Sequence, residues 1–256
     1  MNSIFDNNIG GGPTLKKRIA AFFDIDGTLY REGLITEVFK KLIKSELIET
    51  DRWYKEVKPF FVKWDKRIGN YDNYLLKMAD IYSEAIIGLH KCQIDFIASQ
   101  IVKQKGDRVY TYTRDKIIWH KSQGHIIITV SGSPIELVRE MSIKYGFDDY
   151  IGTKYILDEN NIYTGEIIPM WDSVSKKNAI ESFVCKYNID LDQSYAYGDT
   201  SGDVTMLKLI SHPTAINPTK ELLLNILDDE ELKEKISIIL ERKDVVYRLR
   251  PEHIEI

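Results

Sequence analysis

Residues 18–29 read RIAAFFDIDGTL and decide the fold class of this 256-residue chain. The apolar run predicts a buried strand that ends abruptly at Asp24. Similar runs at His125–Val130, Ser194–Tyr197 and Thr214–Ile216 alternate with helical patterns, and Thr214–Ile216 is the last predicted core strand. Strands that alternate with helices indicate a mainly parallel sheet covered on both faces, so we predict an α/β core.

A long helical pattern separates the first strand from the second. From about residue 32 to residue 105, Lys and Glu are dense and apolar residues recur at helical spacing. This stretch predicts several helices, and Pro59 should end or kink one of them. We therefore predict an inserted helical domain, residues 32–105, within a core domain of residues 15–31 and 106–256.

The remaining elements follow from the same kinds of pattern. The runs Lys154–Leu157 and Ile162–Ile167 predict a hairpin, and Val245–Leu249 is a candidate edge strand. Gly-rich residues 1–14 precede the first strand and predict a flexible tail. Helices are predicted at Asp107–Gln123, Pro134–Tyr145, Lys176–Tyr187 and Val204–Ile210.

Composition excludes several classes of partner. Lys and Arg total 35 against 39 Asp and Glu, which gives a formal charge of −4 and no basic surface for nucleic acid or anionic lipid. No apolar run approaches the roughly 20 residues of a membrane span, and the N-terminus lacks the order of a signal peptide. Cys92 and Cys185 form no C-x-x-C pair, which favours a reducing compartment. We expect a cytoplasmic monomer or homodimer.

Carboxylates follow two of the predicted strands. Asp24 and Asp26 come directly after the first, and Asp199 and Asp203 lie in GDTSGD, which follows Tyr197. Ligands of open parallel sheets bind at the carboxyl ends of the strands, so we expect these side chains to meet there. Burying several unpaired carboxylates would cost several kcal/mol each, and a divalent cation removes that cost. An all-oxygen ligand set suits Mg²⁺, which we predict as the cofactor.

Other residues at this edge suit an anion. Ser131, the amide of Gly132 and Lys176 supply hydrogen-bond donors and positive charge, as a phosphate requires. Lys177 is an alternative to Lys176, but numbering from Lys176 places Ile180 at an apolar position of the following helix. A cation on one side and a lysine on the other favour phosphoryl transfer.

These motifs resemble those of the haloacid dehalogenase (HAD) superfamily of phosphohydrolases. DIDGTL from Asp24 resembles the first motif, Ser131 in TVSGSP the second, Lys176 the third and GDTSGD the fourth. The likeness runs from about residue 19 to about residue 222, and residues 131–155 and 197–218 look closest to subfamily IB, which contains phosphoserine phosphatases. The resemblance implies a HAD-like Rossmannoid core with an inserted helical cap after the first strand, here residues 32–105.

The resemblance also implies a role for each matching residue. Asp24 matches the nucleophile that forms an aspartyl-phosphate, and Asp26 matches the general acid and base, whose backbone carbonyl also binds the metal. The metal ligands would be Asp24, Asp26 and Asp199, with Asp203 orienting a metal-bound water or Lys176. Phosphate would be bound by Ser131, Gly132 and Lys176.

The leaving group is not identified by these motifs. Phosphoserine phosphatases use a cap Glu and a cap Arg for serine, and the matching positions here are Gly33 and Leu76, with Glu32 and Lys77 beside them. We expect a Mg²⁺-dependent phosphatase for a small phosphorylated metabolite. The alternatives are a phosphoserine phosphatase proper, a mutase that uses the same nucleophile, or a non-catalytic metal- or phosphate-binding module.

Aromatic residues are frequent in the predicted cap. They could line a substrate pocket, but aromatic rings dominate buried cores, so we expect most of them to form the small core of the cap. They are Trp53, Tyr54, Phe60, Phe61, Trp64, Tyr71 and Tyr74.

Overall fold

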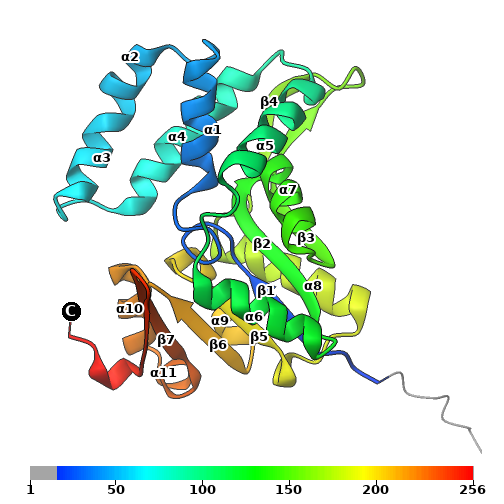
Figure 1. Cartoon of the computed structure of the whole chain (residues 1–256), viewed down its shortest axis with the longest axis vertical. Helices are drawn as coiled ribbons and strands as arrows, with labels where there is room; N and C mark the ends of the chain where they lie inside the picture. The colour runs from blue at the N-terminus through cyan, green and yellow to red at the C-terminus, as the bar shows by residue number, and fades with distance from the viewer. Residues whose placement is uncertain (1–15, 256) are drawn as a thin grey trace, which may run out of the picture.

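The computed structural model describes residues 16–255, so the predicted tail, residues 1–14, lies outside the described residues (Figure 1). One sheet of eight strands has the order β4-β3-β2-β1-β5-β6-β7-β8. The strands are β1 (Ala20–Phe23), β2 (Ile126–Pro134), β3 (Asp149–Leu157), β4 (Tyr163–Ile168), β5 (Tyr195–Gly198), β6 (His212–Ile216), β7 (Ser237–Arg242) and β8 (Val245–Leu249).

The middle of the sheet is parallel and each edge is an antiparallel hairpin. Strands β3, β2, β1, β5, β6 and β7 pair in parallel, whereas β4 pairs antiparallel with β3, and β8 with β7. The predicted α/β class and mainly parallel sheet are confirmed. Strand β3 begins at Asp149, earlier than predicted, because its first half pairs with β2 before its second half joins β4.

The helices connect these strands on both faces. Pro59 lies in the first turn of the helix Lys58–Asp65, which follows a π-helical turn at Trp53–Val57. Gly146 ends the helix Ile135–Tyr145 in the left-handed conformation, with φ +63°. The helices are α1 (Leu34–Lys44), α2 (Thr50–Arg52), α3 (Lys58–Asp65), α4 (Tyr71–Ile86), α5 (Lys91–Lys105), α6 (Thr111–Ser122), α7 (Ile135–Tyr145), α8 (Ser173–Tyr187), α9 (Val204–Leu209), α10 (Lys220–Leu227) and α11 (Glu230–Lys235). Among residues 16–255, every helix is too short or too polar to cross a membrane.

The C-terminal region extends the sheet further than predicted. Thr214–Ile216 lies in β6, but it is not the last core strand, because β7 adds a further parallel strand with Ile238 and Ile239 fully buried. The run that forms β7 stands among Lys and Glu residues, which hides its apolar character in the sequence. The candidate edge strand Val245–Leu249 forms β8.

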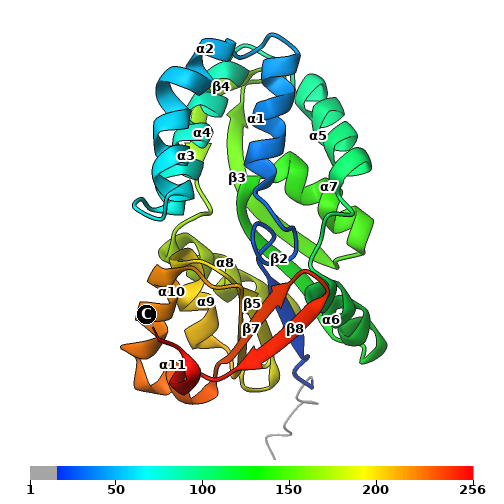
Figure 2. The ribbon, with the colours of Figure 1, turned by 60° about the vertical axis from the view of Figure 1, so that its left-hand side comes forward.

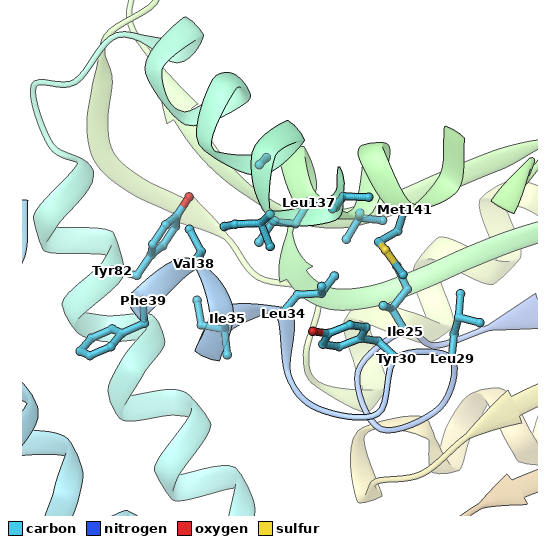
Figure 3. Packing of buried hydrophobic residues seen from close by; sticks show 14 of the residues in the cluster. Ile25, Leu29, Tyr30, Leu34, Ile35, Val38, Phe39, Tyr82, Leu137 and Met141 are labelled. Atoms are coloured by element: carbon cyan, nitrogen blue, oxygen red, sulfur yellow. The ribbon is translucent and has the colours of Figure 1, made fainter. Parts of the chain in front are cut away.

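The side chains of β1 point alternately to the two faces of the sheet, and each face packs against its own hydrophobic cluster. Ala20 and Phe22 face one cluster, beneath α8 to α11, and Ala21 and Phe23 face the other, beside α6 and α7. The second cluster continues into the inserted helices: Figure 3 shows Leu34 and Val38 of α1 in the same buried cluster as Leu137 of α7. The insertion, α1 to α5, is helical as predicted and shares this buried cluster with the sheet. That residues 32–105 form a separate domain stays a prediction.

The inserted helices stand at the end of the sheet where the parallel strands finish. Figure 2 shows α1, α3 and α4 beyond the loop that follows β1, with the β3–β4 hairpin rising beside them. This placement covers the carboxyl ends of the strands, where the predicted catalytic residues lie.

Candidate active site

Adjacent strands bring the predicted motifs together. The order β2-β1-β5 places the loops after these three strands side by side, and the first turn of α8 lies at the same edge. The loop after β1 carries Asp24, and the loop after β5 carries Asp199, both at most 5% exposed. Sequence segments that are far apart therefore meet as the parallel topology predicts.

Lys176 joins two of the carboxylates. Its Nζ lies 3.0 Å from Oδ1 of Asp24 and 2.5 Å from Oδ1 of Asp203. Burial disfavours the ammonium, but the charges of Asp203 and Asp24 outweigh that penalty and raise the pKa of Lys176. A lysine that stays charged beside Asp24 can neutralise an incoming phosphate.

The position of α8 distinguishes the two candidate lysines. The Asp172 carboxylate accepts the N–H groups of Val174 and Ser175, so the helix begins at Ser173, three residues before its predicted start. Its first turn places Lys176 in the site, whereas the side chain of Lys177 is 47% exposed and lies 3.8 Å from Glu181. Geometry favours Lys176.

Two hydrogen bonds hold the carboxylate of Asp26. Its Oδ1 accepts the backbone N–H of Leu34 at 2.7 Å, and its Oδ2 accepts the hydroxyl of Ser133 at 2.5 Å. Burial raises the pKa of Asp26, and these two bonds oppose that shift. The donors come from α1 of the insertion and from the end of β2, so the orientation of Asp26 depends on both.

Asp199 and Asp203 form the other side of the site. The hydroxyl of Thr28 donates to Oδ1 of Asp199 at 3.1 Å, and the backbone N–H of Asp199 donates to Oδ2 of Asp203 at 3.0 Å. Gly27 has φ +75°, and a Cβ there would lie 1.9 Å from Oδ2 of Asp199. A glycine is therefore required for the first loop to approach Asp199.

The carboxylates could hold a metal ion. Oxygens of Asp24, Asp199 and Asp203 lie within 4.8 Å of one another. Burial raises the pKa of Asp24 to about 8, with Asp203 and Asp26 adding to the shift and Lys176 opposing it, and burial also raises the pKa of Asp199 well above its usual range. The single positive charge of Lys176 therefore does not offset the negative charges of these carboxylates. A hard divalent cation such as Mg²⁺ fits this oxygen set.

The end of β2 carries Ser131, Gly132 and Ser133. Gly132 lines the same hollow as Asp24, and a Cβ at this position would lie 3.0 Å from Cβ of Trp171. Ser131 is fully buried, and its Oγ accepts the N–H of Ser133 at 3.2 Å, while Ser133 itself lines the hollow. The phosphate-binding role of Ser131 stays a prediction.

Two hollows lie between the core and the inserted helices. The first, of about 510 Å³, contains Asp24, Asp26 and Lys176. The second, of about 960 Å³, contains Gly27 and Asp199 together with basic side chains. Tyr71 and Glu221 line both hollows, so they belong to the wall that the hollows share.

Most of the cap aromatic rings pack together, as predicted. Phe61 contacts Trp53, Trp64 and Tyr74, with ring centroids 5.5 to 5.9 Å apart. Tyr71 also reaches both hollows. Tyr54 and Phe60 are exposed on the surface, so these two of the seven aromatic residues do not belong to the core of the cap.

Three site residues were missed by sequence reasoning. Thr28 and Ser133 stand inside the quoted motifs, and their place at strand ends is the signal that could have found them. Tyr155 reaches the first hollow from β3, in the predicted hairpin, and no sequence pattern marks it.

Comparisons with known proteins agree with this geometry. A curated relative from Streptomyces azureus, an inhibition of morphological differentiation protein, is 26% identical over 207 residues, which cover 80% of this chain and 74% of that protein. A probable phosphatase from Mycobacterium tuberculosis is 24% identical over 213 residues, or 83% and 73% of the two chains.

A solved structure has the same fold. The phospho-aspartyl intermediate analogue of phosphoserine phosphatase superposes with a TM-score of 0.57 at 21% identity, over 90% of this chain and 96% of that one. The model of the haloacid dehalogenase-like hydrolases matches residues 21–208, well over half of the chain. The predicted resemblance is confirmed, and the chain belongs to the haloacid dehalogenase-like hydrolase family.

Proposed function

We propose that this chain is a Mg²⁺-dependent phosphatase that hydrolyses a small phosphomonoester through an aspartyl-phosphate on Asp24. One observation carries the proposal: Asp24 is held by Lys176 and faces Asp199, while Asp26 is held separately by Ser133. This arrangement supports separate roles for the three carboxylates: Asp24 as nucleophile, Asp199 as metal ligand and Asp26 as proton carrier. Membership of a hydrolase family and the named phosphatase relative support the same reading.

The first step transfers the phosphoryl group to Asp24. Oδ1 of Asp24 contacts Lys176, so its other oxygen is placed to attack phosphorus. The ester O–P bond breaks as the new O–P bond forms, and Asp26 gives a proton to the leaving alcohol. The raised pKa of Asp26 favours the protonated form that this step needs. A bound Mg²⁺ would neutralise charge on the phosphoryl oxygens, held by Asp24, Asp199 and the backbone carbonyl of Asp26.

The second step releases phosphate. Asp26, now ionised, takes a proton from water as that water attacks the phosphorus of the aspartyl-phosphate, and Asp24 leaves as a carboxylate. Gly132 and Lys176 line the space for the phosphate oxygens. The hydrogen bonds from Leu34 and Ser133 keep the Asp26 carboxylate in place for both proton transfers.

Purified full-length protein tests this proposal. Phosphate release from a panel of phosphomonoesters should require added Mg²⁺ and should stop after chelation. Mass spectrometry of acid-quenched enzyme should find phosphate on Asp24, and a phosphorylated serine in its place would contradict the mechanism. Activity that survives thorough chelation would remove the metal from the proposal. Binding of phosphate without any turnover would favour a non-catalytic module, and transfer to a second alcohol instead of water would favour a mutase.

A further inference from the structure

The first hollow has a strongly apolar wall opposite its carboxylates. Helix α4 presents Tyr71, Leu75, Leu76 and Ala79 on one face, because these positions follow one another at helical spacing. Ile35 of α1 lines the same hollow. The volume of about 510 Å³ lies within the range of sites that hold a small organic ligand, so a leaving group can extend from the reacting phosphate onto this wall.

Tyr155 of β3 continues this wall on the core side. Its side chain is buried, and its ring packs edge-on against Tyr82 with centroids 5.0 Å apart. Apolar groups from both the insertion and the sheet thus line part of the hollow.

Charge is distributed unevenly around the hollow. Among residues 16–255, Lys176 is the one cation that lines it, and that ammonium already contacts Asp24 and Asp203. Asp172 and Glu221 also line the hollow. A leaving group that carries a carboxylate would meet negative charge and apolar surface there, with no free positive partner.

The two charged neighbours of the expected cap positions have other partners. Oε1 of Glu32 lies 2.8 Å from Nη2 of Arg108, and Nζ of Lys77 lies 3.2 Å from Oε2 of Glu56. A Cβ at Gly33 would lie 3.3 Å from Cδ2 of Leu75, which leaves little room for a longer side chain. Neither Glu32 nor Lys77 is therefore free to act as a charged anchor in place of Gly33 and Leu76.

Basic side chains occur instead in the second hollow. Arg31, Arg67 and Lys220 line it beside Asp199, on the other side of the wall formed by Tyr71 and Glu221. Arg31 is paired with Glu241 at 3.3 Å. The two hollows are thus chemically distinct, and the nucleophile opens into the apolar one.

We propose that the substrate is the phosphate monoester of an uncharged, mainly apolar alcohol, whose carbon skeleton packs against Ile35, Leu75, Leu76, Ala79 and Tyr155. This inference rests on the proposed phosphatase activity and names its substrate class. The reaction is unchanged: the ester O–P bond breaks, Asp26 protonates the alcohol, and water takes the phosphoryl group from Asp24. Two features would set the specificity. An apolar leaving group buries carbon against this wall, and a leaving group with a carboxylate finds no free cation among the described residues that line the hollow.

A series of alkyl phosphates separates this effect from leaving-group chemistry. Ethyl, butyl and hexyl phosphate release alcohols of similar acidity, so a rise in kcat/KM along the series reports burial of the chain. Each methylene should add up to about fourfold, and hexyl phosphate should exceed ethyl phosphate by at least about tenfold. Hexyl phosphate should also exceed O-phosphoserine.

Matched variants locate the effect. Leu76→Arg places a cation on the apolar wall at a side chain that is 39% exposed, and it should raise kcat/KM for O-phosphoserine while lowering it for hexyl phosphate, by about tenfold or more each. Phe96→Arg makes a similar change on α5, at a residue that is 63% exposed and outside both hollows, and should leave both values within about twofold.

The outcomes distinguish this inference from the activity on which it rests. A flat alkyl series, or O-phosphoserine as the better substrate of a working phosphatase, would overturn the substrate class alone. If O-phosphoserine is preferred and Lys220→Gln removes that preference, the second hollow selects the substrate. Absence of turnover with every phosphomonoester would overturn both proposals. Because the alkyl series uses the unaltered protein, the test stands even if Leu76→Arg does not fold.

Discussion

The two ends of the parallel sheet hold polar side chains in different ways. At the carboxyl ends of β1 and β5, Asp24, Asp199 and Asp203 lie close together, and the ammonium of Lys176 contacts Asp24 and Asp203. At the amino ends of β2, β5 and β6, polar aromatic rings stack instead. The rings of His125 and His212 stack on Tyr195, and the buried ring of His120 meets Tyr195 edge-on.

The difference lies in which form of each group burial favours. Among the carboxylates, burial raises the pKa of Asp24 to about 8, so the ionised form of this proposed nucleophile is held at a cost in stability. Among the rings, burial lowers the pKa of His120 to about 3, so the imidazole is neutral and its contacts add to stability. We therefore expect the carboxyl end of the sheet to carry the proposed chemistry and His120 at the amino end to contribute to the stability of the fold.

The largest expected effect is on turnover in Asp24→Asn. The amide fills the same space but is a poor nucleophile, and losing the nucleophile of a hydrolase lowers kcat by a factor on the order of 10⁶. The free energy of unfolding should stay the same or rise, since a buried charge is removed. Steady-state kinetics and denaturant unfolding on the same preparation check both. A clear loss of stability would break the division between the two ends.

Lys176→Gln should have the next largest effect. Removing a charged donor from the phosphate site should lower kcat/KM by about 10²- to 10³-fold, as with other groups that stabilise developing charge. Lys177→Gln is the matched control, because it makes the same change one residue away on an exposed side chain, and it should stay within about twofold. If the two variants behave alike, the assignment of the phosphate-binding lysine is wrong. Circular dichroism confirms that both are folded.

Ser133→Ala tests the hydrogen bond that positions Asp26. Losing a bond to a charged group typically costs ~1.5–3 kcal/mol, so kcat should fall by roughly 10- to 150-fold. Asp26→Asn should lose about 10²- to 10⁴-fold, because proton transfer is gone. If Ser133 acts through Asp26, the double variant should be no slower than Asp26→Asn. Multiplied losses would mean separate roles. Ser142→Ala removes another buried hydroxyl, on α7, and should leave kcat unchanged.

Much of the candidate site at the carboxyl end of the sheet could be predicted, because its residues directly follow the strands in the sequence. A short apolar run followed by Asp24 fixes both the strand and the edge at which that carboxylate lies. Parallel pairing then brings Asp199 alongside it without any knowledge of the loops. The choice of Lys176 over Lys177 followed from helical periodicity, since only one of two neighbours can face the core.

Contacts that depend on tertiary geometry could not be predicted. The N–H of Leu34 binds Asp26 because α1 begins at that residue, and its N-cap is Gly33, whose side chain gives no capping signal. Tyr155 reaches the first hollow because β3 changes partners along its length. Strand β7 was missed because its apolar residues are surrounded by charged ones. In each case a long-range contact, absent from any local pattern, decides the position.

The smallest expected effect concerns the amino end of the sheet and appears in acid. His120 lies 2.9 Å from Oη of Tyr197 through Nε2, and 2.8 Å from His125 through Nδ1. Burial, together with His125 and Lys116, lowers the pKa of its imidazole to about 3, whereas an unfolded imidazole titrates near ~6.5. Its contribution to stability is therefore complete above about pH 6.5 and is lost as the pH falls towards 3. At pH 5 the loss is about 2 kcal/mol.

His120→Gln should remove this dependence. The variant will be less stable at pH 7.5, because it loses ring contacts, but the further drop in unfolding free energy between pH 7.5 and pH 5 should shrink by about 2 kcal/mol. Denaturant titrations at the two pH values measure both quantities, and the exposed His212→Gln serves as the control. At pH 7.5 the folded variant should keep the kcat of the unaltered protein, since no ring of this cluster lines either hollow. An undiminished acid loss in His120→Gln would mean that other buried groups set the acid limit, and a fall in kcat would show that the two ends of the sheet are coupled.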